Sequence, residues 1–127
     1  MASLVQSDAD AFVYSDEKLP HLLEQAKALQ PLMREMAPEA ERLRTLAPPV
    51  EQALWRMDAF SLMLPARVGG AGLSLCAYGR VLMEFAKGDP SVAWVVQILN
   101  GTSWGGTLAV DDIQIATGLD CHIAVAA

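Results

Sequence analysis

Apolar residues recur at alternating spacings of four and three positions between residues 22 and 47. This spacing places them on one stripe of an α-helix, with charged and amide side chains on its other faces. The stripe consists of Leu22, Ala26, Leu29, Met33, Met36, Ala40, Leu43 and Ala47. Pro31 and Pro38 interrupt the pattern, because proline lacks a backbone donor and clashes with the turn before it. The pattern predicts one kinked helix, or two consecutive helices of which the second begins near Pro38.

Two further helices are indicated by caps and by apolar spacing. Pro48 and Pro49 end the first segment, and Pro49 is suited to open a short amphipathic helix that reaches Met57. Ser74 is a suitable N-cap for a later helix, because its hydroxyl can accept a free backbone N–H of the first turn. The apolar residues of that helix are Tyr78, Val81, Leu82, Phe85 and Ala86.

Residues 88–91 read as the end of one helix and the start of the next. Gly88 can close the first helix in the left-handed conformation, Asp89 can cap the second, and Pro90 suits its first position. The following residues, 90–99, are apolar on nearly every side. A helix with that pattern is expected in the middle of a bundle.

Three glycines within four residues, at positions 69, 70 and 72, mark a fixed bend between helices. Their spacing is not the G-x-G-x-x-G fingerprint of dinucleotide binding, and no strand of a βαβ unit is predicted before them. The segment is therefore interpreted as a helix-to-helix corner, with a phosphate-binding loop as the alternative.

These elements predict an all-α fold, a bundle of about five to six helices, with a strand start at the C-terminal end. Residues 1–17 show no sustained period and are expected to form a flexible leader. The helical domain is expected to span residues 18–120, including a short helix at about 111–116 after a stretch loosened by glycines. Residues 121–127 read as the first strand of a unit that this sequence does not contain.

Charge and composition exclude several partners. The formal net charge is −6, and no lysine or arginine follows Lys87, so a nucleic-acid partner is not expected. The most apolar run, residues 92–99, is too short to span a membrane, and the acidic N-terminus is no secretory signal. Cys76 and Cys121 are expected to be reduced thiols of a cytoplasmic protein. Because 53% of the residues are hydrophobic, we expect part of the surface to meet another domain or a second copy in a homo-oligomer.

Few residues form a recognisable catalytic group. No metal-ligand cluster and no catalytic triad can be assembled, so no catalytic and no metal site is predicted. His21 and His122 are expected to be structural or solvated. Glu84 is the single carboxylate on its apolar helix before Gly88. We expect it to be exposed, with a buried ion pair to Arg67 or Arg80 as the alternative.

The segment from Trp94 to Trp104 combines flat aromatic rings with polar groups on an apolar helix. Asn100 and Ser103 lie between the two indoles. A few hydrogen-bonding groups on an apolar surface are typical of a pocket wall that orients an apolar ligand. The alternative is that the indoles fill the core and the polar groups cap the helix.

Two motifs together resemble a known family. Residues 64–74 read L-P-x-x-x-G-G-x-G-L-S, and residues 84–94 read E-x-A-x-G-D-P-S-x-A-W. In this order they resemble the N-terminal helical domain of the acyl-CoA dehydrogenase superfamily, over about residues 20–127. The Asp-Pro-Ser-Val-Ala-Trp version of the second motif, with the helix around residues 41–44, is closest to the flavin-dependent monooxygenase branch related to aromatic hydroxylases.

The resemblance implies an N-terminal, substrate-side domain that is not catalytic alone. FAD or FMN would be bound in the complete enzyme by a β-domain and a C-terminal helical domain, on this chain or a separate one, and none is expected on this chain alone. Oxidation at carbon requires that cofactor, because no side chain accepts a hydride. The implied substrate-binding residues are Trp94, Asn100, Ser103, Trp104 and Tyr78. The alternatives are a stand-alone helical interaction or scaffold module that lost catalysis, and a small-ligand carrier.

Overall fold

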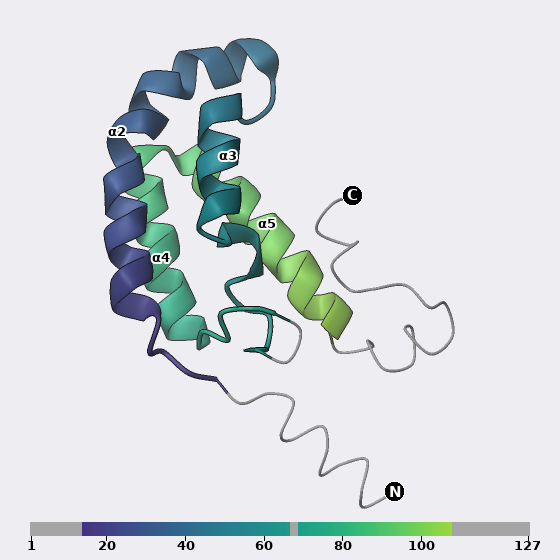
Figure 1. The fold of residues 1–127 in the computed structure, drawn as a ribbon. Helices are drawn as coiled ribbons and strands as arrows, with labels where there is room; N and C mark the ends of the chain where they lie inside the picture. Colours follow the sequence, from purple (N-terminus) through teal and green to yellow (C-terminus); the bar gives the residue numbers. More distant parts are fainter. Residues whose placement is uncertain (1–13, 67–68, 108–127) are drawn as a thin grey trace, which may run out of the picture.

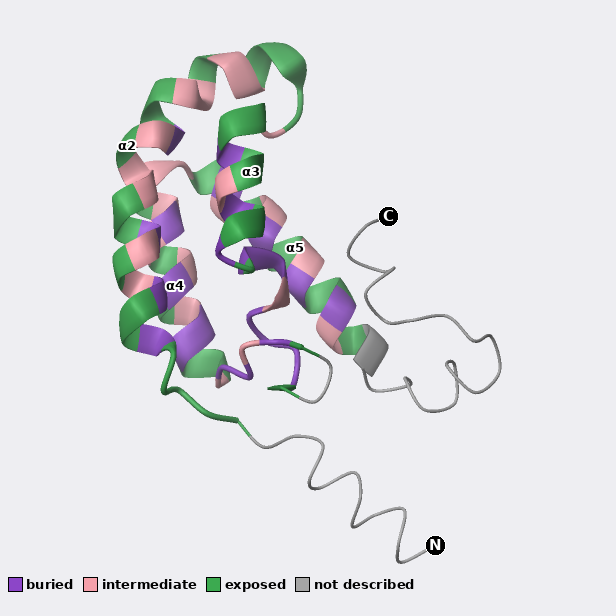
Figure 2. Ribbon diagram, viewed as in Figure 1, coloured by how far each residue is buried: buried purple, intermediate pink, exposed green. Residues whose placement is uncertain are grey.

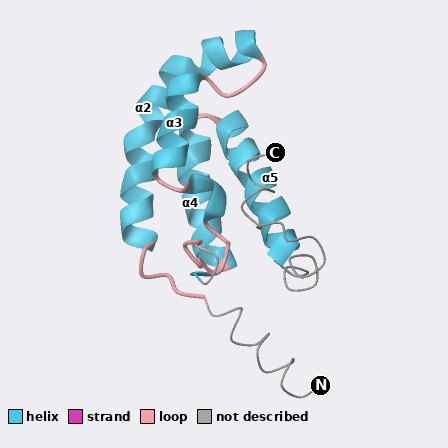
Figure 3. Cartoon of the chain, turned by 45° about the vertical axis from the view of Figure 1, so that its right-hand side comes forward, coloured by secondary structure: helices cyan, strands magenta, loops and turns pink. Residues whose placement is uncertain are grey.

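The computed structural model describes residues 14–66 and 69–107 of the 127-residue chain. Within these residues the fold is entirely helical, as predicted, and no strand is formed (Figures 1 and 3). The elements are α2 (Leu19–Leu43), α3 (Pro48–Arg56), the 3₁₀ turn η1 (Ala59–Ser61), α4 (Leu75–Gly88) and α5 (Pro90–Thr107). The helix expected at 111–116 and the strand expected at 121–127 lie outside the described residues.

Helix α2 is one continuous helix that contains both Pro31 and Pro38. Its axis bends, so that its first half runs beside α4 and its far end reaches over α3 (Figure 1). Proline removes an intrahelical hydrogen bond and crowds the preceding turn, which is the usual cause of such a bend. Of the two alternatives from the sequence, the single kinked helix is confirmed. The apolar stripe fades past the bend, where Leu43 is 38% exposed.

The core is shared by α2, α3, α4, one side of α5 and the segment around η1. Leu22, Ala26 and Met33 of α2 are buried, as are Val81 and Phe85 of α4. Figure 2 shows the buried residues along the facing sides of α2 and α4. The predicted amphipathic spacing of both helices therefore identified their core faces correctly.

The junction between α4 and α5 corrects one prediction and confirms another. Among the described glycines only Gly69 and Gly72 have positive φ, so Gly88 is not left-handed. A Cβ on Gly88 would lie 2.8 Å from Met33 Sδ and 3.1 Å from Gln30 Cα, so glycine is required for close helix packing. Asp89 caps α5 as predicted, because its Oδ1 accepts the backbone N–H of Ser91 at 2.8 Å.

The glycine corner is a fixed bend, as predicted. Gly69 and Gly72 have φ values of 86° and 64°, which favour glycine. A Cβ on Gly70 would overlap the backbone of Leu64. The backbone N–H of Gly72 donates to Leu64 O at 2.9 Å, and that of Leu73 donates to Leu62 O at 3.0 Å.

The residues just before α2 are tied to this corner. Ser15 N donates to Gly72 O at 2.8 Å. The Asp16 carboxylate accepts the backbone N–H of Ser74 at 2.9 Å and its hydroxyl at 2.8 Å. Ser74 also caps α4 as predicted, since its Oγ accepts Ala77 N at 3.2 Å. The last part of the predicted leader thus holds the start of α4.

Helix α5 does not lie in the middle of the bundle, and it does not end near residue 99. It continues to Thr107, and one side packs while the other is open (Figure 2). Val92 and Val96 are buried, whereas Trp94 is 61% and Ile98 47% exposed. The expectation was wrong because a helix that is apolar on both sides can be buried on only one. None of the described helices is long and apolar enough to cross a membrane.

Candidate functional site

The five residues predicted to line a substrate pocket lie in two separate places. Asn100, Ser103 and Trp104 lie in the C-terminal half of α5, and Tyr78 lies across from that helix on α4. Trp94 lies near the other end of α5, on its exposed side. The helical period explains this separation. Asn100 and Ser103 lie on the same buried side of α5 as Val92 and Val96, whereas Trp94 lies on a different side.

Asn100 is completely buried, and its amide bonds only to the protein's own backbone. Its Oδ1 accepts the N–H of Leu62 at 2.8 Å and that of Met63 at 3.3 Å. Its Nδ2 donates to the carbonyls of Ala59 at 2.7 Å and Val96 at 2.9 Å. Asparagine offers two donors and an acceptor with two lone pairs, so this side chain is fully used. In this structure Asn100 holds the segment around η1 against α5.

Tyr78 and Ser103 are buried beside the same segment of α5. The Tyr78 hydroxyl donates to Gln97 O at 3.5 Å, and desolvation by burial raises the pKa of this phenol to about 12. Tyr78 is therefore neutral and cannot serve as a base near neutral pH. Ser103 is 2% exposed, and its hydroxyl has no hydrogen-bond partner among the described residues. Trp104 is half-buried and packs on the core.

Trp94 borders an open groove with a volume of about 940 Å³. Three parts of the chain form it: the bent end of α2, the start of α3, and the junction that leads into α5. Its lining residues are Ala37, Ala40, Glu41, Arg44, Thr45, Leu46, Glu51, Asp89, Pro90, Ser91, Val92, Trp94 and Val95. No local motif in the sequence marks this groove, because it depends on the bend of α2.

The groove combines an aromatic wall with mostly acidic edges. Glu41, Glu51 and Asp89 supply carboxylates, and Arg44 is the cation. Arg44 ends α2 with a left-handed φ of 57°. The Asp89 carboxylate is already used by the cap of α5. Such a surface can bind a ligand, and the described residues hold no cluster of metal ligands.

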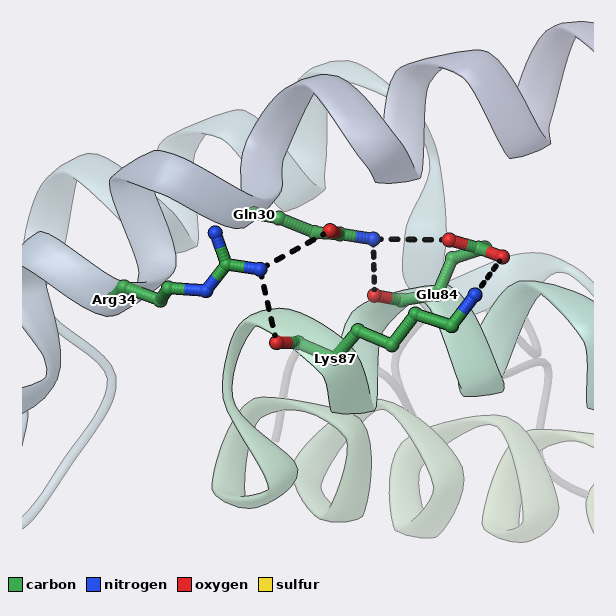
Figure 4. Close-up of polar contacts among 4 residues, drawn as sticks. All are labelled: Gln30, Arg34, Glu84 and Lys87. Atoms are coloured by element: carbon green, nitrogen blue, oxygen red, sulfur yellow. Dashed lines mark hydrogen bonds and ion pairs between the residues drawn. The ribbon is translucent and has the colours of Figure 1, made fainter.

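Glu84 belongs to a polar cluster between α2 and α4, so the expectation that it is exposed is wrong. Its side chain is 13% exposed and lies 2.8 Å from Lys87 Nζ. Gln30 Nε2 donates to the Glu84 carboxylate and to its backbone carbonyl, each at 2.9 Å (Figure 4). Arg34 Nη2 donates to Lys87 O at 3.3 Å. The ion-pair partner is thus Lys87 rather than Arg80, and Arg67 lies outside the described residues.

The charged and polar groups of this cluster stabilise one another and hold α2 against α4. The hydrogen bond from Lys87 lowers the pKa of Glu84 from its ordinary value, desolvation opposes this shift, and Gln30 adds to it. A carboxylate held in its charged form by a neighbouring cation is poorly suited to act as a general base. His21 is exposed in the first turn of α2, and His122 lies outside the described residues.

Within the described residues, the fold and site define a small helical domain in which Asn100 and Glu84 bond to the protein itself and α5 is open on one side. The family described as "Acyl-CoA dehydrogenase, N-terminal domain" matches residues 22–109, more than half of the chain. The chain belongs to this family. No curated protein and no solved structure shows a significant match. The family implies FAD in the full enzyme and further domains or chains beside this one.

Proposed function

We propose that this chain is the substrate-side domain of a flavin-dependent oxidoreductase and forms one wall of its substrate site. The proposal rests on the difference between the two sides of α5, of which one is buried and the other exposed. Its inner side is fixed by the buried Asn100, and its outer side presents Trp94 and Ile98. FAD would be held by a β-domain and a C-terminal helical domain, on the same chain or a separate one.

The outer side of α5 suits a flat or extended apolar ligand. Trp94 and Ile98 are one turn apart and largely exposed. Further along the helix, a Cβ added at Gly101 or Gly105 would meet nothing within 4 Å. A ligand or a neighbouring domain can therefore lie close to the helix backbone there. Covering each of the two large side chains would contribute roughly 1.5–3 kcal/mol.

The residues of this chain are suited to make apolar contact beside the flavin, and they are not suited to hold it by hydrogen bonds. A flavin ring needs hydrogen-bond partners along its polar edge, and the cofactor supplies the two-electron acceptor. Trp94 and Ile98 offer apolar contact, and the hydroxyl of Thr102 already donates to Ile98 O at 2.8 Å. These residues would position substrate and exclude water.

The finer assignment within the family is to the monooxygenase branch. It is supported by the Asp-Pro-Ser-Val-Ala-Trp segment at residues 89–94 and by the helix around residues 41–44. The structure adds that Asp89 and Pro90 form the start of α5 and that Trp94 follows one turn later at the groove. An aromatic substrate would stack on this indole, whereas an acyl chain would run along the helix.

The test uses the native protein purified from the cells that make it. We expect a visible flavin spectrum and an assembly that contains a β-domain sequence, on this chain or on a second one. The intrinsic fluorescence of Trp94 should change when FAD is removed and restored. Trp94→Phe should abolish that change, and the matched variant Trp55→Phe, on α3, should keep it.

The opposite result would be a stable, flavin-free homodimer with no β-domain. It would contradict the enzyme-domain proposal and favour a helical interaction module. The exposed Leu75 and Met83 on α4, 70% and 62% exposed, are the side chains that such a dimer would cover.

A further inference from the structure

A second hollow lies on the side of the molecule where α2 begins. Its volume is about 360 Å³. It is bordered by the first turns of α2, the end of α3 with the turn that follows, and the glycine corner. The lining residues are Lys18, His21, Leu22, Gln25, Arg56, Met57, Asp58, Gly69 and Ala71.

Basic side chains dominate this hollow, although the chain as a whole carries a net charge of −6. Lys18, His21 and Arg56 border it, against the single carboxylate of Asp58. They come from segments far apart in the sequence, which the fold brings to one place. Gln25 adds a neutral amide that can also donate.

The cations of this hollow differ from several others in the described part of the chain. Arg42 is paired with Glu39 at 2.6 Å, and Lys87 is paired with Glu84 at 2.8 Å. Within residues 14–66 and 69–107, Lys18 and Arg56 have neither an ion-pair partner nor a side-chain hydrogen bond. Their donors are therefore free to bind an anion from solution.

We propose that this hollow binds a phosphate group. An arginine guanidinium matches two phosphate oxygens with two parallel N–H donors, and lysine adds a compact positive charge. Arg56, at the end of α3, and Lys18, just before α2, would take these two roles, with His21 and Gln25 as further donors. Asp58 opposes the anion, so it limits affinity. This site is separate from the open side of α5 and does not depend on the flavin proposal.

The proposal is tested by titrating the full chain with pyrophosphate at constant ionic strength, observed by calorimetry and by backbone amide NMR. We expect saturable binding with shifts that concentrate at Lys18, His21, Arg56 and Gly69. Absence of saturable binding, or shifts spread over every exposed cation, would overturn the proposal.

Matched variants make the test specific. Arg56→Gln should raise the dissociation constant about tenfold or more, because a charge-assisted, two-pronged contact is lost. Arg80→Gln removes the same charge from an exposed position on α4 outside the hollow, and it should leave the dissociation constant unchanged. Equal effects of these two variants would overturn the proposal. Lys18→Gln provides the same comparison if Arg56→Gln fails to fold.

Asp58→Asn is the opposite variant. It removes the one opposing charge, and asparagine tolerates the left-handed φ of 55° found at this position. It should tighten pyrophosphate binding several-fold, and no change would count against the hollow as the site. Inorganic phosphate and ADP, titrated in parallel, distinguish the source of the group: tighter binding of ADP through the same residues indicates a nucleotide ligand.

Discussion

The side-chain oxygen of Asn100 accepts the backbone N–H of Leu62 at 2.8 Å, although the two residues are 38 positions apart. Asn100 sits on the buried side of α5, and Leu62 follows η1. This contact joins α5 to the segment that leads into the glycine corner. It also means that Asn100, one of the five residues predicted to bind substrate, bonds to the protein's own backbone.

Replacing Asn100 with alanine should lower the free energy of unfolding by about 3 kcal/mol. The substitution leaves the buried N–H of Leu62 and the carbonyl of Ala59 without their side-chain partner, and such groups cost about 1–3 kcal/mol each. The measurement is equilibrium unfolding in urea. Ser103→Ala is the control: its hydroxyl has no partner among the described residues, so its loss should be neutral or stabilising. Equal destabilisation by both variants would contradict this assignment.

Gly88→Ala should destabilise the domain by about 1–3 kcal/mol, even though alanine favours helix. Its Cβ would press on Met33 Sδ at 2.8 Å and on the backbone of Gln30 at 3.1 Å. Gly79→Ala on the same helix is the matched control. Its Cβ would meet nothing within 4 Å, so it should raise stability by about 0.5–1 kcal/mol. Thermal unfolding of both variants checks the opposite signs, and a stabilised Gly88→Ala would refute the close approach of α2 and α4.

Glu84 should make stability depend on pH in the acid range. Its pKa in the folded chain is lowered, chiefly by the hydrogen bond from Lys87, from an ordinary value of 4.5. A lowered carboxylate pKa contributes stability that is present above the ordinary value and is lost as pH falls through the folded value. Urea unfolding should therefore show wild type more stable than Glu84→Gln at neutral pH, with the difference shrinking below about pH 4.5. A constant difference down to pH 2 would contradict the ion pair, and Glu35→Gln, exposed on α2, is the control.

Shortening a side chain to alanine should change stability differently on the two sides of α5. Val96→Ala should cost about 2 kcal/mol, because Val96 is fully buried and the lost methyl groups leave a cavity. Ile98→Ala, two positions later, should change stability by less than about 0.5 kcal/mol, because that side chain is 47% exposed. Chemical denaturation of each variant measures the change in its free energy of unfolding. A large loss at Ile98 would mean that another surface covers this side in solution.

The local sequence was sufficient for the starts of the helices, their N-terminal caps and the fixed corner, but not for the end of α5 or the conformation of Gly88. Ser74 and Asp89 were recognised as caps because a short side-chain oxygen next to a helix start satisfies free N–H groups within three residues. The glycines at the corner were recognised because positive φ is a property of the backbone at that residue. The family was also indicated by two short motifs, at residues 64–74 and 84–94, and the family match over residues 22–109 confirms it. Each of these features depends on residues that are close together in the sequence.

Only the tertiary structure decided which apolar and polar groups are exposed. Trp94 and Val96 are both apolar residues of one helix, yet one is largely open and the other buried. Asn100 bonds to Leu62 and Met63 across 38 and 37 positions, and Glu84 bonds to Gln30 across 54, so no local pattern could assign these partners. The sequence by itself determined the helical elements, because their signals are local. Burial, the two hollows and the partners of polar side chains depend on how α2 bends and on which side of α5 packs, and these are decided by the sum of contacts between distant segments.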